Sequence, residues 1–147
     1  MDGRGEDSLY IPAGGSQMPA TPETVAARQH FVIQDGATVF KAAVSGMAEV
    51  TAAVMARNDV TAEDIAWFVP HQANIRILQS VAKRLGFEHE KVMVNLSRYG
   101  NTTGGTIPLC ISEWHGKGLL QYGDRMVLSS FGAGFTMGSI LLRWAIP

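Results

Sequence analysis

The pattern of apolar and polar positions along the chain predicts helices and strands in alternation. In residues 37–57, apolar side chains recur at intervals of three and four, which marks one face of an amphipathic helix. Residues 65–69 are continuously apolar and too few for a buried helix, so they predict a strand covered on both faces. Residues 73–85 return to the helical spacing, and Gly86 is typical of a helix end.

The other segments continue this order. Residues 104–115 predict a helix that tolerates Pro108 because proline fits in a first turn. Residues 125–130 and 136–144 predict two strands of a hairpin around a glycine-rich turn. Shorter signals predict strands at residues 9–11, 30–33 and 92–94, a loop at residues 12–24, and one capped helical turn at residues 61–64. Strands alternating with helices indicate an α/β layered architecture.

The domain organisation follows from the same pattern. We predict a single domain over residues 1–147, with a loop-rich segment at residues 1–30 and a core βαβ unit at residues 31–147. The first thirty residues contribute little to a core. Such a start is typical of a cut through a larger protein.

Composition narrows the class of protein. Hydrophobic residues make up 46% and charged residues 17%, which indicates a globular chain. The formal net charge of -1 argues against a general nucleic-acid binder. No apolar run approaches the roughly 20 residues that span a bilayer, and the polar residues 1–8 do not form a signal peptide, so no membrane partner is expected. The single cysteine, Cys110, excludes an internal disulfide and suits a reducing cytoplasm.

Two polar residues occupy similar places on the predicted fold. His71 follows Pro70 at the end of the buried strand, where ligands and catalytic groups gather in α/β folds. Asn101 follows Gly100 and precedes another predicted helix. A neutral histidine and an asparagine at neighbouring turns can donate to one oxygen and stabilise an enolate or oxyanion. The alternative interpretation is structural, with His71 capping or packing and Asn101 capping a helix or turn.

Further candidates carry weaker signals. Residues 131–135 could offer backbone N–H groups to an anion or simply form a β-turn. Arg76, Lys83 and Arg84 form a basic helix face, which matters only if the partner is acidic. Cys110 predicts an inert thiol because no neighbour in the sequence would lower its pKa. The histidines lack metal-ligand spacing and no dinucleotide motif is present, so neither a metal nor a cofactor is expected.

Three motifs in order carry a resemblance to a known family. Val-Pro-His-Gln-Ala-Asn-Ile-Arg at residues 69–76, Tyr-Gly-Asn-Thr at residues 99–102 and Phe-Gly-Ala-Gly-Phe-Thr-Met-Gly at residues 131–138 closely resemble the C-terminal half of β-ketoacyl-acyl carrier protein synthase III. Residues 39–44 also look like that family. The resemblance implies a thiolase-like fold, of which this chain is the C-terminal half within an αβαβα layered whole.

The resemblance also implies a reaction. The family uses a Cys-His-Asn triad, whose cysteine takes an acyl group from a coenzyme A thioester. Malonyl-acyl carrier protein then loses CO2, and the carbanion attacks the acyl-enzyme in a Claisen condensation. His71 and Asn101 match the histidine and the asparagine, which would hydrogen-bond the malonyl thioester oxygen as the enolate forms.

Other positions take roles from the resemblance alone. Ala133 matches a position whose backbone N–H contributes to the oxyanion hole, although the family often has glycine there. Asn74 matches an active-site residue, and Phe40 is expected to line the substrate tunnel. Arg76, together with Lys83 on the basic face, is expected to dock the acyl carrier protein.

The family's nucleophilic cysteine lies in an N-terminal half that this sequence does not contain, and Cys110 occupies a different place. We therefore expect the chain alone to be inactive and to be complete only with that half, as a cytoplasmic enzyme that is a homodimer when whole. Two alternatives remain open. One is a related polyketide- or quinolone-type condensing enzyme, and the other is a non-catalytic module that docks acyl carrier protein.

Overall fold

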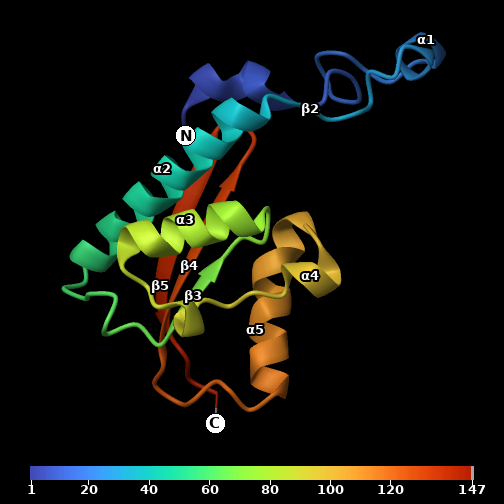
Figure 1. Ribbon diagram of the computed structural model, residues 1–147. Coiled ribbons are helices and arrows are strands. Elements are labelled where there is room, and N and C mark those ends of the chain that lie inside the picture. The colour runs from blue at the N-terminus through green and yellow to red at the C-terminus, as the bar shows by residue number, and fades with distance from the viewer. Residues whose placement is uncertain (147) are drawn as a thin grey trace. The chain divides into compact units, whose positions relative to one another are not determined.

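The computed structural model describes residues 1–146 and separates into two compact units, each described here by itself (Figure 1). The first unit contains residues 1–42 and 132–136, and the second contains residues 43–131 and the chain from residue 137 onward. The division falls inside one long helix and at the turn between the last two strands. No comparison bears on the expected single-domain organisation, which stays a prediction.

The first unit holds short elements and the start of a long helix. Its strands β1 (Leu9–Tyr10) and β2 (Ile33–Gln34) pair antiparallel, with Leu9 opposite Gln34. The strand expected at residues 9–11 is therefore confirmed, whereas the one expected at residues 30–33 is displaced toward Gln34. The remaining elements are η1 (Gly3–Ser8), α1 (Pro22–Ala26) and the beginning of α2 (Gly36–Ala56).

Helix α1 was not expected, because residues 12–24 predict a loop. It forms at the end of that segment, where Thr21 and Thr24 make a reciprocal capping box. Pro22 occupies the first helical turn, where its missing N–H costs nothing. Local capping chemistry thus produces a helix of five residues without an apolar face.

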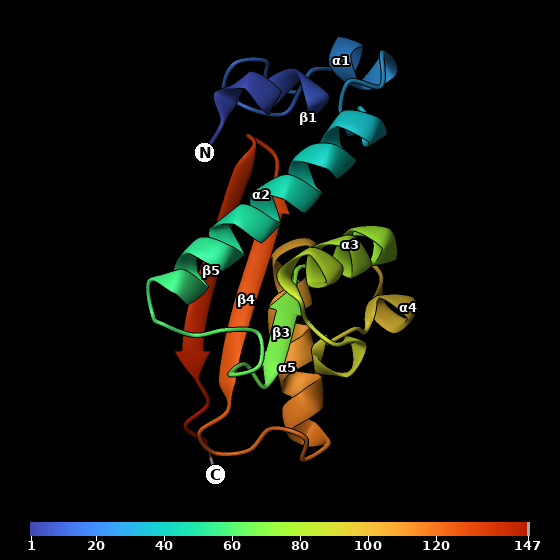
Figure 2. The same ribbon diagram turned by 60° about the vertical axis from the view of Figure 1, so that its left-hand side comes forward.

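The second unit is built on a three-stranded sheet in the order β3-β4-β5. Strand β3 (Trp67–Pro70) lies parallel to β4 (Arg125–Gly132), with Trp67 opposite Met126 and Pro70 opposite Ser129. Figure 2 shows β5 (Thr136–Arg143) running against β4, so the predicted hairpin is confirmed. The helical elements are the rest of α2, α3 (Ile75–Leu85), η2 (His89–Lys91), α4 (Leu96–Tyr99), η3 (Thr103–Gly105) and α5 (Thr106–Gly116).

Successive side chains of β3 point to opposite faces of the sheet, and both faces are covered by other parts of the chain. Trp67 and Val69 pack into a cluster with Cys110 of α5. Phe68 points to the opposite face and stacks on Phe87 at a ring distance of 4.8 Å. Figures 1 and 2 show α3 and α5 on opposite faces of this sheet. The continuous apolar run therefore forms a strand covered on both faces, as predicted.

Some local expectations were wrong. Residues 61–64 form a turn rather than a helical turn, although Asp64 Oδ2 does accept from the Thr61 N–H at 2.8 Å. Residues 92–94 contribute a single parallel bridge, Val92 to Phe68, instead of a strand. Helix α4 has only four residues, and no apolar repeat in the sequence predicts it. Short elements such as these depend on tertiary contacts more than on local pattern.

Helix α2 qualifies the expectation about membranes. With 21 residues, it is long and apolar enough to cross a bilayer by length and composition, although polar residues interrupt its apolar positions. Nearly half of its most apolar stretch is buried in the structure. The core helix of a soluble protein passes the same test, so this single helix is weak evidence for a membrane span.

Candidate active site

The His71 turn, residues 70–74, begins where β3 ends. The His71 N–H donates to the carbonyl of Ser129 at 2.8 Å, which carries the parallel ladder one bond beyond Pro70. The side chain is half-buried, and burial lowers the pKa of the His71 imidazole from its ordinary value of 6.5. The imidazole is therefore neutral near pH 7, because desolvation disfavours its charged form.

Gln72 is fully buried and holds this turn from inside the core. Its Nε2 donates to the carbonyls of Pro70 at 2.8 Å and Met93 at 3.0 Å, and its Oε1 accepts from the Asn95 N–H at 3.1 Å. Both ends of the amide are thus used on backbone groups from two segments. Gln72 fixes the path that the chain takes as it leaves β3.

The Asn101 turn, residues 100–106, follows α4. Gly100 ends that helix at φ +67°, a conformation that suits glycine. Asn101 Oδ1 accepts from the Thr103 N–H at 2.9 Å. Because a backbone N–H needs an acceptor, this bond identifies Oδ1 and leaves Nδ2 as the donor end of an exposed side chain.

Thr103 has an unusual backbone conformation within the Asn101 turn. Its φ is +51°, in the left-handed region that a β-branched residue rarely adopts. Such a conformation costs on the order of 1–3 kcal/mol and persists only where neighbouring contacts impose it. Residues of this kind cluster at functional sites, which directs attention to the Asn101 turn.

Thr106 joins the two turns. Its Oγ1 lies 2.6 Å from His71 Nδ1 and donates to the carbonyl of Thr103 at 3.1 Å. Thr103 in turn donates its N–H to Asn101. The structure therefore connects His71 and Asn101 through Thr106 and Thr103. That the two side chains donate to one reacting oxygen stays a prediction.

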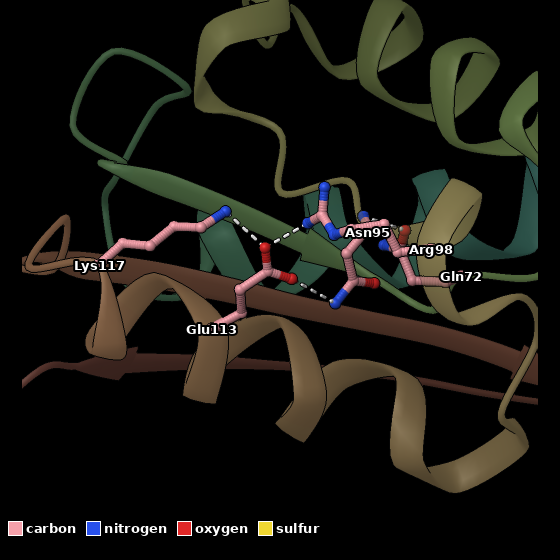
Figure 3. Close-up of polar contacts among 5 residues, drawn as sticks. All are labelled: Gln72, Asn95, Arg98, Glu113 and Lys117. Atoms are coloured by element: carbon pink, nitrogen blue, oxygen red, sulfur yellow. Dashed lines mark hydrogen bonds and ion pairs between the residues drawn. The ribbon is translucent and has the colours of Figure 1, made fainter.

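A polar network on α5 supports the same region (Figure 3). Glu113 accepts from Asn95 Nδ2 at 3.3 Å and forms ion pairs with Arg98 and Lys117. Hydrogen bonds from Arg98 first and Lys117 second hold the pKa of Glu113 at about 2. Since Asn95 also donates its backbone N–H to Gln72, the network links α4 and α5 to the His71 turn.

Cys110 lies on the buried side of α5 and has no exposed surface. Burial, with a smaller contribution from the Glu113 carboxylate, raises the pKa of the Cys110 thiol to about 11. A nucleophilic cysteine needs a lowered pKa and access to its substrate. The burial and the raised pKa of Cys110 agree with the inert thiol expected from the sequence.

Three candidate residues lie on or next to α3. Asn74 caps the helix, since its Oδ1 accepts from the Arg76 N–H at 2.8 Å. Arg76 and Lys83 are exposed and lie seven residues apart, about two turns, so they share one side of the helix. Arg84 was expected to belong to the same basic face. Its Nη1 instead donates to Ser45 Oγ of α2 at 3.1 Å.

Phe40 and Ala133 belong to the first unit. Phe40 is half-buried on α2, and Ala133 is exposed in the turn that joins β4 to β5. Their expected roles in the tunnel and the oxyanion hole stay predictions. Among residues 1–146, no group of three or more His, Cys, Asp or Glu side chains could hold a metal ion.

Sequence reasoning missed Gln72, Thr103, Thr106 and Glu113. Gln72 lies next to the candidate histidine, and both threonines follow shortly after the motif at residues 99–102, so nearness in the sequence was an available signal. The burial of Gln72 and the left-handed φ of Thr103 have no signature in the spacing of residues. The link from Thr106 to His71 spans 35 positions and appears only in the folded chain.

Comparisons with known proteins identify the family of the chain. Residues 55–144 match the model of the 3-oxoacyl-[acyl-carrier-protein (ACP)] synthase III C terminal family. The chain is 53% identical over 140 residues to the β-ketoacyl-[acyl-carrier-protein] synthase III of Chlorobaculum tepidum, covering 95% of this chain and 43% of that protein. The chain thus spans less than half the length of the curated relatives that it matches.

Solved structures show the same relation. The 3-oxoacyl-(acyl carrier protein) synthase III of Pseudomonas aeruginosa PAO1 superposes with a TM-score of 0.84 at 38% identity, over 99% of this chain and 43% of that one. The priming β-ketosynthase of the R1128 polyketide biosynthetic pathway gives 0.84 at 26% identity, over 100% and 43%. These likenesses confirm the α/β, thiolase-like fold expected from the sequence. The chain belongs to the C-terminal family of the 3-oxoacyl-[acyl-carrier-protein] synthases III.

Proposed function

We propose that this chain is the C-terminal catalytic part of a fatty-acid initiation condensing enzyme. The reaction is a decarboxylative Claisen condensation between an acyl group taken from a coenzyme A thioester and malonyl-acyl carrier protein. The observation that carries the proposal is the hydrogen-bonded connection between His71 and Asn101 through Thr103 and Thr106. Family membership supports the reaction type.

The two side chains act on the malonyl thioester. When the bond to the carboxylate breaks and CO2 leaves, negative charge develops on the thioester oxygen. Donors aimed at that oxygen stabilise the enolate, typically by 10²–10³-fold in rate for each donor. Asn101 Nδ2 is the donor end left by the bond to Thr103, and His71 supplies the second group. The family resemblance alone assigns the Ala133 N–H to the oxyanion of the acyl-transfer step, and Phe40 and Asn74 to lining roles.

The nucleophile comes from outside this chain. Cys110 has no exposed surface and a raised pKa, so it does not serve. Acyl transfer requires an activated thiolate, which an N-terminal half of the same enzyme would supply. The chain alone is therefore inactive, and the complete enzyme is a cytoplasmic homodimer that needs no cofactor beyond its thioester substrates.

Arg76 and Lys83 dock the acyl carrier protein in this proposal. Both are exposed on one side of α3, and α3 begins directly after the His71 turn. Cationic side chains on such a face attract an acidic partner and increase its association rate. A chain that bound carrier protein in this way without supporting condensation would fit the alternative of a non-catalytic docking module.

A chimera tests the proposal. The C-terminal 43% of the Chlorobaculum tepidum synthase is replaced by this chain, and the condensation of acetyl-coenzyme A with malonyl-acyl carrier protein is measured. We expect condensation by the chimera and none by this chain alone. His71→Ala and Asn101→Ala should each lower malonyl decarboxylation by about 10²–10³-fold.

His89→Ala is the matched control, because His89 is exposed and lies on η2, outside both turns. A folded chimera without condensation activity would contradict the proposal. So would unchanged decarboxylation after His71→Ala or Asn101→Ala. Arg76→Glu and Lys83→Glu should weaken carrier-protein binding, and unchanged affinity would contradict the docking role.

A second condensing function also has support. The structural likeness to the R1128 priming β-ketosynthase supports, as the second candidate, a related enzyme that starts a polyketide. The His71 and Asn101 geometry is compatible with both. Comparing the rates of the chimera with acetyl-coenzyme A and with longer acyl-coenzyme A thioesters probes only the contribution of this half to chain-length preference.

A further inference from the structure

Asn95 lies where the supports of the two turns meet (Figure 3). It is the residue before α4 and is only 1% exposed. Its backbone N–H donates to Gln72 Oε1 at 3.1 Å, and its side-chain Nδ2 donates to Glu113 Oε2 at 3.3 Å. One buried residue therefore joins the side chain that holds the His71 turn to helix α5.

The chemistry of the partners fixes the direction of both bonds. A backbone N–H only donates, so Gln72 presents its amide oxygen to Asn95. Hydrogen bonds from Arg98 and Lys117 keep the pKa of Glu113 at about 2, so this carboxyl is ionised at neutral pH. A carboxylate only accepts, so Asn95 presents its NH2 group to Glu113.

Glu113 holds α4 at both ends of that short helix. Its Oε2 accepts from Asn95 before the first residue of α4, and its Oε1 forms an ion pair with Arg98 in the same helix. Asn101 lies two residues beyond the last residue of α4, in a largely exposed turn. The position of α4 on α5 therefore determines where the Asn101 turn begins.

We propose that Asn95 is a positioning residue, whose hydrogen bond to Glu113 sets the Asn101 turn relative to the His71 turn. The inference rests on the proposed function for the reaction that the two turns serve. Placement matters there because a displacement of about 1 Å can cost about 10²-fold in rate. Asn95 acts through α4 and Gln72 and touches no substrate in this scheme.

An exchange of donor and acceptor tests this hydrogen bond. Asn95→Asp places a second carboxylate opposite Glu113, and Glu113→Gln places a second NH2 group opposite that of Asn95. The double variant restores the bond in the opposite direction, because the new amide at position 113 then donates to the new carboxylate at position 95. Both substitutions keep the shape of the side chain, and the double variant keeps the net charge.

The first readout is malonyl decarboxylation by the chimera, with kcat expressed per folded enzyme. Each single variant should lower kcat by about 10-fold or more, because the donors are misplaced. The KM for malonyl-acyl carrier protein should stay within about twofold, because the proposed docking side chains are unchanged. The double variant should recover kcat to within about threefold of the wild type.

A purely structural role would change the folded fraction but not the kcat of the folded enzyme. Asn58→Asp is the matched control, because it makes the same substitution at an exposed residue after the end of α2. It should leave kcat unchanged. An unchanged kcat in folded Asn95→Asp would overturn the proposal. If a single variant does not fold, the double variant still decides, and its failure to recover folding or activity would also overturn the proposal.

The second readout uses the chain alone and involves no turnover. In ¹H–¹⁵N correlation spectra, the amide signals of His71 and Thr103, one from each turn, should both move in Asn95→Asp. Both should return toward their wild-type positions in the double variant. A Thr103 signal that does not move would overturn the proposal. An inactive wild-type chimera would contradict the proposed function instead and would leave this second readout intact.

Discussion

The His71 turn and the Asn101 turn present comparable side chains but are held in different ways. The His71 turn is anchored from inside by Gln72, which has no exposed surface and bonds three backbone groups. The Asn101 turn is largely exposed. The Asn101 side chain accepts a hydrogen bond from the backbone N–H of Thr103, within the same turn. One turn depends on the core, and the other depends on local bonds and on α5.

This difference indicates which of the two turns holds its side chain more rigidly. Buried hydrogen bonds are costly to break because the groups left behind find no water. Exposed bonds are cheap to break, and segments with few buried contacts open locally before the whole fold does. We therefore expect the His71 turn to be the rigid partner and the Asn101 turn to be the adjustable one.

The largest expected effect follows from Gln72→Leu. Leucine fills the space but leaves the carbonyls of Pro70 and Met93 and the N–H of Asn95 without their buried partner. The free energy of unfolding should fall by about 3 kcal/mol, since each orphaned group costs about 1–3 kcal/mol. Urea unfolding measures the change.

Gln79→Leu serves as the control, because Gln79 is exposed on α3. Its effect should stay within about 0.5 kcal/mol. A loss below 1 kcal/mol for Gln72→Leu would show that the His71 turn does not depend on this side chain, and the contrast between the turns would disappear.

Glu113→Gln should have the next largest effect, about 1–2 kcal/mol at neutral pH and low salt, because it removes two ion pairs. Arg98 and Lys117 are half exposed, so solvent screens both pairs. The folded pKa of Glu113 is about 2, below its ordinary value of 4.5, so the stabilisation is complete above pH 4.5 and is lost as the pH falls toward 2.

The difference in unfolding free energy between wild type and Glu113→Gln should therefore shrink over that range of pH. Glu90→Gln, at an exposed position of η2, is the matched control for neutralising a surface carboxylate. A difference between wild type and Glu113→Gln that stays constant down to pH 2 would contradict the assigned ion pairs.

Asn74→Ala should cost about 1 kcal/mol, because it removes the side chain that caps α3. Asn74→Ser keeps a capping oxygen and should restore most of that stability. If Asn74 serves only as a cap, Asn74→Ser should also restore condensation by the chimera. A stable Asn74→Ser chimera without activity would instead support the active-site role expected from the family resemblance.

Thr103→Asn should have the smallest effect and the opposite sign. Asparagine tolerates a positive φ better than a β-branched residue, so we expect a gain of about 0.5 kcal/mol in unfolding free energy. Thr103→Ala, which retains a Cβ, should gain less. A loss of stability in Thr103→Asn would show that the Thr103 side chain contributes more than its backbone conformation costs.

Much of the fold was predictable because it depends on periodic patterns. The apolar repeat of α2, the continuous apolar run of β3 and the two strands β4 and β5 all lie within a few residues of their expected bounds. Helix α3 was expected to start at residue 73 but begins at Ile75, because Asn74 takes the capping position. The short helices α1 and α4 escaped prediction, and the strand expected at residues 92–94 is reduced to one bridge at Val92, since capping and tertiary contacts decide such elements.

The sequence by itself determined which residues could carry the chemistry: His71 at the end of a buried strand, Asn101 beside a glycine, and a cysteine with no activating neighbour. Those properties depend on residue type and local spacing, which a sequence contains. Only the tertiary structure decided that Thr106 and Thr103 link the two turns, and that Gln72 and Glu113 support them. Burial and contacts between distant segments depend on where those segments meet in the folded chain, so spacing along the sequence could not predict them.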